Sequence, residues 1–175
     1  MTRHAWFTGL SLCLLLPLIP ATAAENWHQW RGPGSNGHTT ASDVPVTWTA
    51  DSVTWKTTIP GVGQSTPVMW GNRIFLTSAS STGNQRHVFC IDRTSGEILW
   101  QHKAYEGEAE PTHSMNNRAS ATCVTDGERV IAFFGRGGIH CYDLDGKVLW
   151  SEQLSTFPGP WGTAASPIIV GDLVI

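Results

Sequence analysis

Short runs of apolar residues, each ending at a turn-forming residue, follow one another along most of the chain. In the first such unit we expect strands over residues 66–70, 73–79, 86–92 and 97–103. These runs are rich in Val, Ile, Phe and Trp, which strands favour, and Gly, Asn, Asp or Ser bounds each of them. The pattern therefore predicts a unit of four short strands joined by tight turns.

Two of these runs are apolar on both faces of the expected strand. Residues 74–76 read Ile-Phe-Leu, and residues 130–134 read Val-Ile-Ala-Phe-Phe. A strand with apolar side chains on both faces belongs to a sheet that lies between other sheets. Four-stranded sheets stacked around a central axis are the blades of a β-propeller. We therefore predict an all-β fold, a β-propeller of four-stranded antiparallel blades.

The unit recurs at intervals of roughly fifty residues, the period of a propeller blade. Three markers recur with it: an aspartate, a glycine and a tryptophan. The first copy carries Asp92, Gly96 and Trp100, and the second carries Asp143, Gly146 and Trp150. We expect the aspartates to accept hydrogen bonds from turn amides and the glycines to allow the hairpin turn. The tryptophans are expected to pack between adjacent blades.

The repeat sets the expected domain boundaries. A signal peptide is expected over residues 1–24, an N-terminal extension over 25–52 and the propeller over 53–175. Within the propeller we expect a closing strand over 53–59, blade one over 65–103, blade two over 120–153 and the start of blade three over 165–175. This amounts to about two and a half of the seven or eight blades that a closed propeller would have. We therefore expect the chain to be the N-terminal part of a longer protein.

The first residues have the pattern of an export signal. Arg3 and His4 form a polar start, an apolar stretch follows over residues 5–19, and Ala21-Thr22-Ala23 supplies the small residues of a cleavage site. Because the apolar stretch is short and contains Pro17, a transmembrane anchor is the less favoured alternative. We expect a periplasmic or secreted protein with no membrane insertion after the signal is removed.

Composition and charge narrow the possible partners. The sequence has 14 acidic and 11 basic residues, and no run of basic residues suggests a nucleic-acid partner. After the signal three cysteines remain, Cys90, Cys123 and Cys141. An odd number excludes complete pairing within this segment, and none has the spacing of a metal site. We expect Cys90 and Cys141, at equivalent repeat positions, to be small buried apolar groups.

The repeat, with its Asp-x-x-x-Gly or Asp-x-Asp-Gly turn before an apolar-apolar-Trp strand, resembles the repeat of pyrroloquinoline-quinone (PQQ)-type propellers. Residues 27–37, which begin Trp-His-Gln-Trp-Arg-Gly-Pro, and residues 113–120, which read His-Ser-Met-Asn-Asn-Arg-Ala-Ser, resemble segments of exported bacterial members. The family includes quinoprotein dehydrogenases and outer-membrane assembly lipoproteins. The chain lacks both the adjacent cysteine pair typical of the alcohol dehydrogenases and a credible lipidation cysteine. The resemblance therefore implies the fold and leaves the activity open.

Loops that connect the outer strand of one blade to the inner strand of the next usually form the binding face of a propeller. Here these loops cover residues 60–64, 104–119 and 155–164. Our candidates for ligand binding on them are His113, Asn117, Arg118 and Trp161. They could meet an anionic or polyol ligand, with the Trp161 ring as a stacking surface. The alternative is that their hydrogen bonds only hold the loop in place.

The long loop also carries three carboxylates near an imidazole. Glu106, Glu108, Glu110 and His113 could supply oxygen and nitrogen ligands to a metal ion. Alternating glutamates are more typical of a solvated acidic loop, so we expect no metal.

Two functions are consistent with these patterns. We expect an exported, non-catalytic propeller that acts as a binding or scaffold module for a protein or a polysaccharide, without a cofactor. The alternative is a periplasmic PQQ-dependent alcohol or sugar dehydrogenase, which would need PQQ and Ca²⁺. We assign no catalytic residue.

Overall fold

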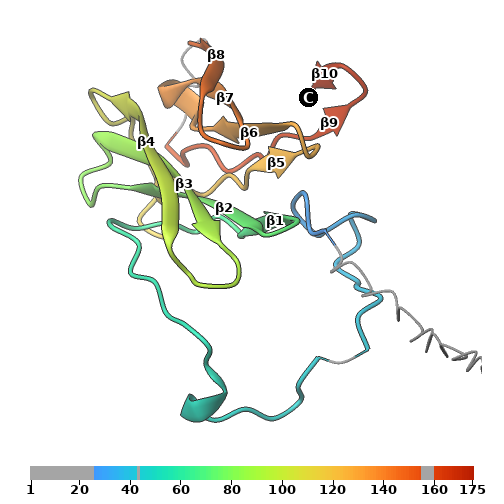
Figure 1. Ribbon diagram of the computed structural model, residues 1–175. Coiled ribbons are helices and arrows are strands. Elements are labelled where there is room, and N and C mark those ends of the chain that lie inside the picture. The colour runs from blue at the N-terminus through green and yellow to red at the C-terminus, as the bar shows by residue number, and fades with distance from the viewer. Residues whose placement is uncertain (1–25, 43, 155–159) are drawn as a thin grey trace, which may run out of the picture.

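The computed structural model describes residues 26–42, 44–154 and 160–175, so the predicted signal peptide lies outside the described residues. The chain is all-β, with two four-stranded antiparallel sheets and a two-stranded fragment (Figure 1). The first sheet has the order β1 (Val68–Trp70), β2 (Arg73–Ala79), β3 (Gln85–Asp92) and β4 (Ile98–Glu106). The second has the order β5 (Val124–Thr125), β6 (Arg129–Phe133), β7 (Ile139–Asp143) and β8 (Val148–Glu152). The fragment pairs β9 (Ile169–Val170) with β10 (Leu173–Val174).

The described residues also form two short 3-10 helices, η1 (Ala50–Ser52), which precedes β1, and η2 (Gly135–Gly137). η2 forms the connection between β6 and β7. Within the described ranges, no helix combines the length and the apolar character that crossing a membrane requires.

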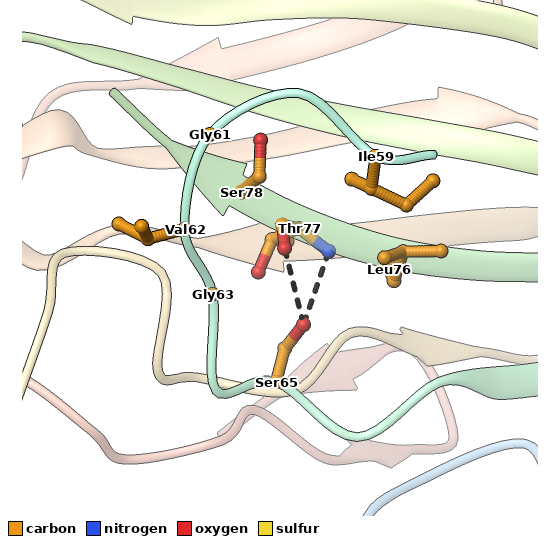
Figure 2. Close-up of a pocket in the computed structure, with 8 residues that line it drawn as sticks. All are labelled: Ile59, Gly61, Val62, Gly63, Ser65, Leu76, Thr77 and Ser78. Atoms are coloured by element: carbon orange, nitrogen blue, oxygen red, sulfur yellow. Dashed lines mark hydrogen bonds between the residues drawn. The ribbon is translucent and has the colours of Figure 1, made fainter. Parts of the chain in front are cut away.

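The predicted strands of the first unit are confirmed, with changes at their ends. β2 has the predicted bounds, whereas β4 continues three residues further than expected. β1 starts two residues later than predicted, because the residues before it contact β2 through an isolated bridge and a side-chain hydroxyl rather than through continuous strand pairing. Val62 forms an isolated bridge with Ala79, and the Ser65 hydroxyl bonds to both backbone groups of Thr77 (Figure 2).

The two sheets repeat each other in register as well as in strand order. Cys90 lies opposite Trp100 in the first sheet, and Cys141 lies opposite Trp150 in the second. Each sheet has a register shift immediately after its cysteine, which marks a β-bulge between the third and fourth strands. The equivalence of Trp100 and Trp150 that the repeat predicted is therefore confirmed.

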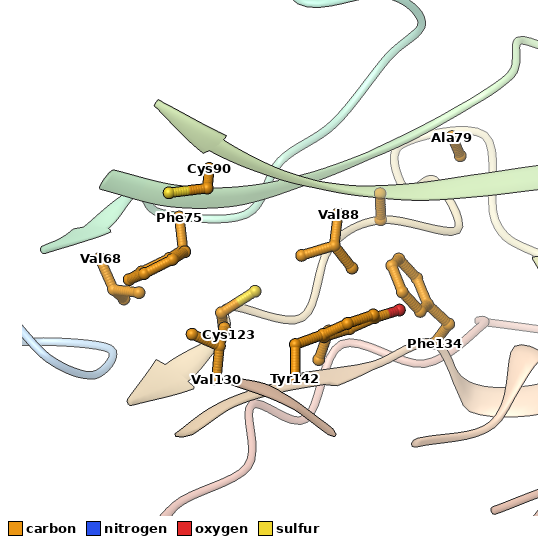
Figure 3. Packing of buried hydrophobic residues seen from close by; sticks show 11 residues of the cluster. Val68, Phe75, Ala79, Val88, Cys90, Cys123, Val130, Phe134 and Tyr142 are labelled. Atoms are coloured by element: carbon orange, nitrogen blue, oxygen red, sulfur yellow. The ribbon is translucent and has the colours of Figure 1, made fainter. Parts of the chain in front are cut away.

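An apolar layer between the two sheets holds them together (Figure 3). Its fully or almost fully buried side chains include Val68, Phe75, Val88 and Cys90 from the first sheet, Val130 and Tyr142 from the second, and Cys123 and Phe134, which lie next to β5 and β6. Each buried Val or Phe of this kind stabilises the fold by about 1.5–3 kcal/mol. Burial raises the pKa of the Cys90 and Cys141 thiols to about 12 and about 11, so both stay neutral and apolar as expected. The pKa of the buried Cys123 thiol is likewise raised, to about 12.

Trp100 connects the outer strand of the first sheet to the hairpin of the second. Its indole N–H donates to the carbonyl oxygen of Leu144 at 3.0 Å, and its ring covers Gly146. A Cβ on Gly146 would lie 2.8 Å from Trp100 Cγ, so only glycine allows this approach. Trp100 therefore packs between blades as predicted, while Trp150 is 37% exposed and its packing stays a prediction.

Trp55 repeats this arrangement at the hairpin of the first sheet. Its indole N–H donates to the carbonyl oxygen of Arg93 at 2.9 Å, and its ring covers Gly96. Segment 53–59 was expected to be a closing strand, but it forms no strand in this structure. Its side chains nevertheless alternate, with Trp55, Thr57 and Ile59 half-buried and their neighbours exposed. That the segment completes another blade stays a prediction.

The aspartate markers cap the hairpins, as the sequence predicted. Asp92 Oδ1 accepts from the backbone N–H groups of Thr94 and Ser95, each at 2.8 Å. Asp143 Oδ1 accepts from the N–H groups of Asp145 and Lys147. The hydrogen bonds that Asp92 accepts, above all the one from the Ser95 N–H, hold the pKa of its carboxyl below the usual value.

The N-terminal extension is tied to both sheets, a role that the sequence did not suggest. Trp27 exchanges two backbone hydrogen bonds with Met69 on β1, at 3.0 and 2.8 Å. The carbonyl oxygen of the next residue, His28, accepts from the N–H of Thr125 on β5 at 2.9 Å. One short segment therefore connects the first strands of the two sheets.

We expect Gly146→Ala to lower the free energy of unfolding by about 3 kcal/mol. The new methyl group would overlap the Trp100 ring, and an L-residue is strained at a φ of 88°. Gly71→Ala is the control, since it too has a positive φ but nothing lies within 4 Å of the added carbon, so about 1 kcal/mol is expected. Denaturant unfolding measures both variants, and equal costs would contradict the Trp100 contact.

Candidate functional site

Two of the four predicted ligand-binding residues meet at one end of the sheets. The rings of His113 and Trp161 lie 5.2 Å apart, inclined by 33°. The Trp161 carbonyl oxygen accepts from Asn116 Nδ2 at 2.9 Å and from the Thr112 hydroxyl at 3.2 Å. These bonds fix the backbone of Trp161, while its side chain remains 66% exposed.

The other two predicted residues are used inside the loop. Arg118 donates to the carbonyl oxygen of Glu110 from Nη2 at 2.9 Å and from Nε at 3.3 Å. Asn117 Oδ1 accepts from the N–H of Ala119 at 2.7 Å. The structure therefore divides the predicted set, since Asn117 and Arg118 hold the loop and only His113 and Trp161 lie together.

Arg86 is a central residue of this region that the sequence analysis missed. Its side chain is fully buried and forms an ion pair with the carboxylate of Glu110. It also donates to the carbonyl oxygen of Phe134 on the second sheet, and its guanidinium carbon lies 4.7 Å from the centre of the Tyr105 ring. One cation from β3 thus joins the long loop to the end of β6.

The expectation of a solvated acidic loop is right for two of its glutamates and wrong for the third. Glu106 pairs with Lys103, both exposed, and exposed Glu108 pairs with half-buried Arg136. Glu110 is buried, and its carboxylate neutralises the charge of the buried Arg86 side chain. Within the described ranges, no group of three or more His, Cys, Asp or Glu side chains is arranged to hold a metal ion.

His140 is another buried titratable group at this end. Its Nε2 lies 2.8 Å from the carbonyl oxygen of Gly137, which can only accept, so Nε2 carries the proton. Nδ1 then accepts from the Ser151 hydroxyl at 3.1 Å. Burial lowers the pKa of His140, partly opposed by the Gly137 bond, and favours the neutral ring.

A cleft beside β2 is too small for a large ligand. It has a volume of about 130 Å³ and lies between segment 61–65 and the strand residues Leu76, Thr77 and Ser78 (Figure 2). Its side-chain hydroxyls already bond to the backbone, Ser65 to Thr77 and Ser78 to Pro60.

PQQ, the cofactor after which the repeat family is named, does not fit the groups that these loops present. A polyanionic quinone needs cationic donors and a divalent ion beside it. Arg118 and Arg86 are both engaged with Glu110, and its carboxylate is held by Arg86.

Comparison with known proteins supports the repeat. The family model described as outer membrane protein assembly factor BamB matches residues 26–175. A polyvinylalcohol dehydrogenase from Pseudomonas sp is 24% identical over 169 residues, which cover 91% of this chain and 24% of that protein. The chain thus spans about a quarter of the length of that curated relative.

Two solved structures are similar over part of this chain. BamB from Moraxella catarrhalis is 17% identical with a TM-score of 0.48, over 67% of this chain and 35% of that one. A europium-containing methanol dehydrogenase is 19% identical with a TM-score of 0.45, over 62% of this chain and 19% of that one.

We expect Glu110→Gln to lower the free energy of unfolding by about 3–5 kcal/mol, because the buried Arg86 charge would lose its counter-charge. Glu108→Gln removes the exposed pair with Arg136 and should change stability by less than about 0.5 kcal/mol. Denaturant unfolding at neutral pH measures both. Similar small effects would show that the Arg86–Glu110 pair does not hold the loop.

A pH dependence should follow from His140. Its folded pKa lies below the unfolded value, so the unfolded chain binds the proton more strongly. The associated stability is present above the unfolded pKa, near 6.5, and is lost as the pH falls from there toward the folded pKa. His140→Gln should therefore lose less stability than the parent between neutral and mildly acidic pH in denaturant titrations. His38→Gln, at an exposed position, is the control and should follow the parent.

Proposed function

This chain belongs to the PQQ-like propeller family described as outer membrane protein assembly factor BamB, and we propose that it serves as a non-catalytic binding module. Its partner is a protein segment that docks on the loop surface, which we define as Gln64, His113, Ser114, Met115 and Trp161. The predicted export signal places this activity in the periplasm or outside the cell.

One observation carries the proposal: two large apolar side chains are exposed on a backbone that hydrogen bonds hold in place. Met115 is 79% exposed, while its carbonyl oxygen accepts from Gln64 Nε2 at 3.0 Å. Trp161 is also largely exposed, with its carbonyl oxygen bonded to Asn116 and Thr112. Aromatic and Met side chains are enriched at protein interfaces, and a backbone that is already ordered lowers the entropic cost of binding.

The contacts that Arg86 and Arg118 make with Glu110 within the protein favour a binding module over a cofactor-dependent enzyme. An anionic cofactor at this end would compete with the Glu110 carbonyl oxygen for Arg118 and with the Glu110 carboxylate for Arg86. A docking protein needs neither guanidinium and can use the exposed rings as they stand.

A quinoprotein dehydrogenase is the second candidate, favoured by the similarity to a polyvinylalcohol dehydrogenase. That activity would require PQQ and Ca²⁺ to be held by residues beyond those described. The two candidates therefore differ in a measurable way, in whether the full-length protein takes up the cofactor.

The test begins with a photo-crosslinking residue placed at position 115 in the full-length protein in its own cells, and at exposed Trp48 as control. The protein captured only from position 115 is purified and titrated against the parent and the variants Trp161→Ala and Trp48→Ala. We expect Trp161→Ala to weaken binding at least about tenfold and Trp48→Ala to leave it unchanged.

Equal affinity of the parent and Trp161→Ala would contradict the loop surface as the docking site. A parallel titration with PQQ and Ca²⁺ addresses the alternative. Stoichiometric uptake with substrate-dependent reduction of a dye would show that the dehydrogenase is the correct function.

A further inference from the structure

A groove lies between the two sheets at the end opposite to the loop surface. Its volume is about 300 Å³, the lower limit of typical ligand pockets. Residues of the β1–β2 turn, the β3–β4 hairpin and the β7–β8 hairpin line it: Trp70, Gly71, Asn72, Arg73, Asp92, Leu99 and Leu144. Nothing in the proposed function uses this groove.

One wall of the groove is a rigid pair of planar polar groups. Asn72 Nδ2 donates to Asp92 Oδ2 at 2.6 Å, and Asn72 Oδ1 accepts from the Thr94 hydroxyl at 2.8 Å. Asp92 Oδ1 is held by two turn amides, so the carboxylate cannot rotate away. The amide keeps a second N–H and the carboxylate keeps further lone pairs for a ligand.

Arg73 adds donors without giving the groove a positive charge. Its Nη2 bonds to Asp145 of the second sheet, and a guanidinium has five N–H donors in all. Asp92 and Asp145 together outweigh the single guanidinium. The charges therefore disfavour an anionic ligand and suit a neutral one with many hydroxyl groups.

Apolar side chains also line the groove. Trp70 is half-buried, and one part of its ring lies against Gly127 so closely that a side chain there would overlap it. Leu99 lies at the β-bulge of the first sheet and is 47% exposed, and Leu144 adds a second aliphatic side chain. A flat indole in the same groove as planar hydrogen-bonding groups suits a molecule with an apolar face and polar edges.

We propose that this groove binds a neutral saccharide unit of an oligo- or polysaccharide. The sugar ring packs on Trp70, while its hydroxyl groups bond to Asn72, Asp92 and Arg73. A peptide strand cannot extend the sheet at β1, because the edge of that strand at Met69 already pairs with Trp27. The site is independent of the loop surface and does not rest on the proposed protein partner.

The test titrates the full-length protein with three neutral oligosaccharides, cellohexaose, chitohexaose and maltohexaose, by calorimetry and tryptophan fluorescence. Saturable binding of at least one of them is expected. Asn72→Ala and Trp70→Phe should each weaken it about tenfold or more, and Trp161→Ala should leave it unchanged. Because Asn72 is exposed, Asn72→Ala should keep the circular dichroism spectrum and the thermal midpoint close to those of the parent.

Several results would overturn the saccharide site. These are the absence of saturation with all three sugars, an unchanged affinity in Asn72→Ala and Trp70→Phe, or tighter binding of an oligogalacturonate or an unstructured decapeptide at the same groove. The groove and the loop surface share no residue. Failure of the saccharide to bind therefore leaves the proposed protein partner standing, and failure of the protein partner to bind leaves the saccharide site standing.

Discussion

The contact of Trp100 with the neighbouring hairpin determines how the two sheets meet. The indole is fixed at both ends, by a hydrogen bond to the Leu144 carbonyl oxygen and by a glycine with a φ of 88° beneath its ring. With the outer strand held there, the apolar faces of both sheets close on one shared layer. Trp55 lies over Gly96 in the same way, although its own segment forms no strand.

At the loop end a buried ion pair has the corresponding role. Arg86 comes from the first sheet, and it bonds to Glu110 of the long loop and to the end of β6 in the second sheet. A buried charge is costly unless it is paired. Displacing the loop would therefore leave the Arg86 charge either exposed to water or buried without a partner. The ordered backbone of the loop surface, with Met115 and Trp161 exposed on it, depends on this anchor.

The two ends of the sheets therefore differ in chemistry. The loop end buries the Arg86–Glu110 ion pair and exposes the large apolar side chains of Met115 and Trp161, which suits a protein partner. The hairpin end exposes a fixed amide and carboxylate, Asn72 and Asp92, beside an indole, which suits a polyhydroxylated ligand. Such a division would let one propeller hold a protein and a polysaccharide at the same time.

Local patterns in the sequence determined the strands, the four-strand repeat and the capping of the hairpins by Asp92 and Asp143. These features follow from side-chain alternation and turn chemistry, which act over a few residues. Only the tertiary structure decided which loop residues meet. Arg86 and Glu110 are 24 positions apart, and their pairing depends on where the loop crosses the two sheets. The separation of Arg118 from His113 and Trp161, and the place of Trp27 beside β1, depend on the same placement, which no local pattern encodes.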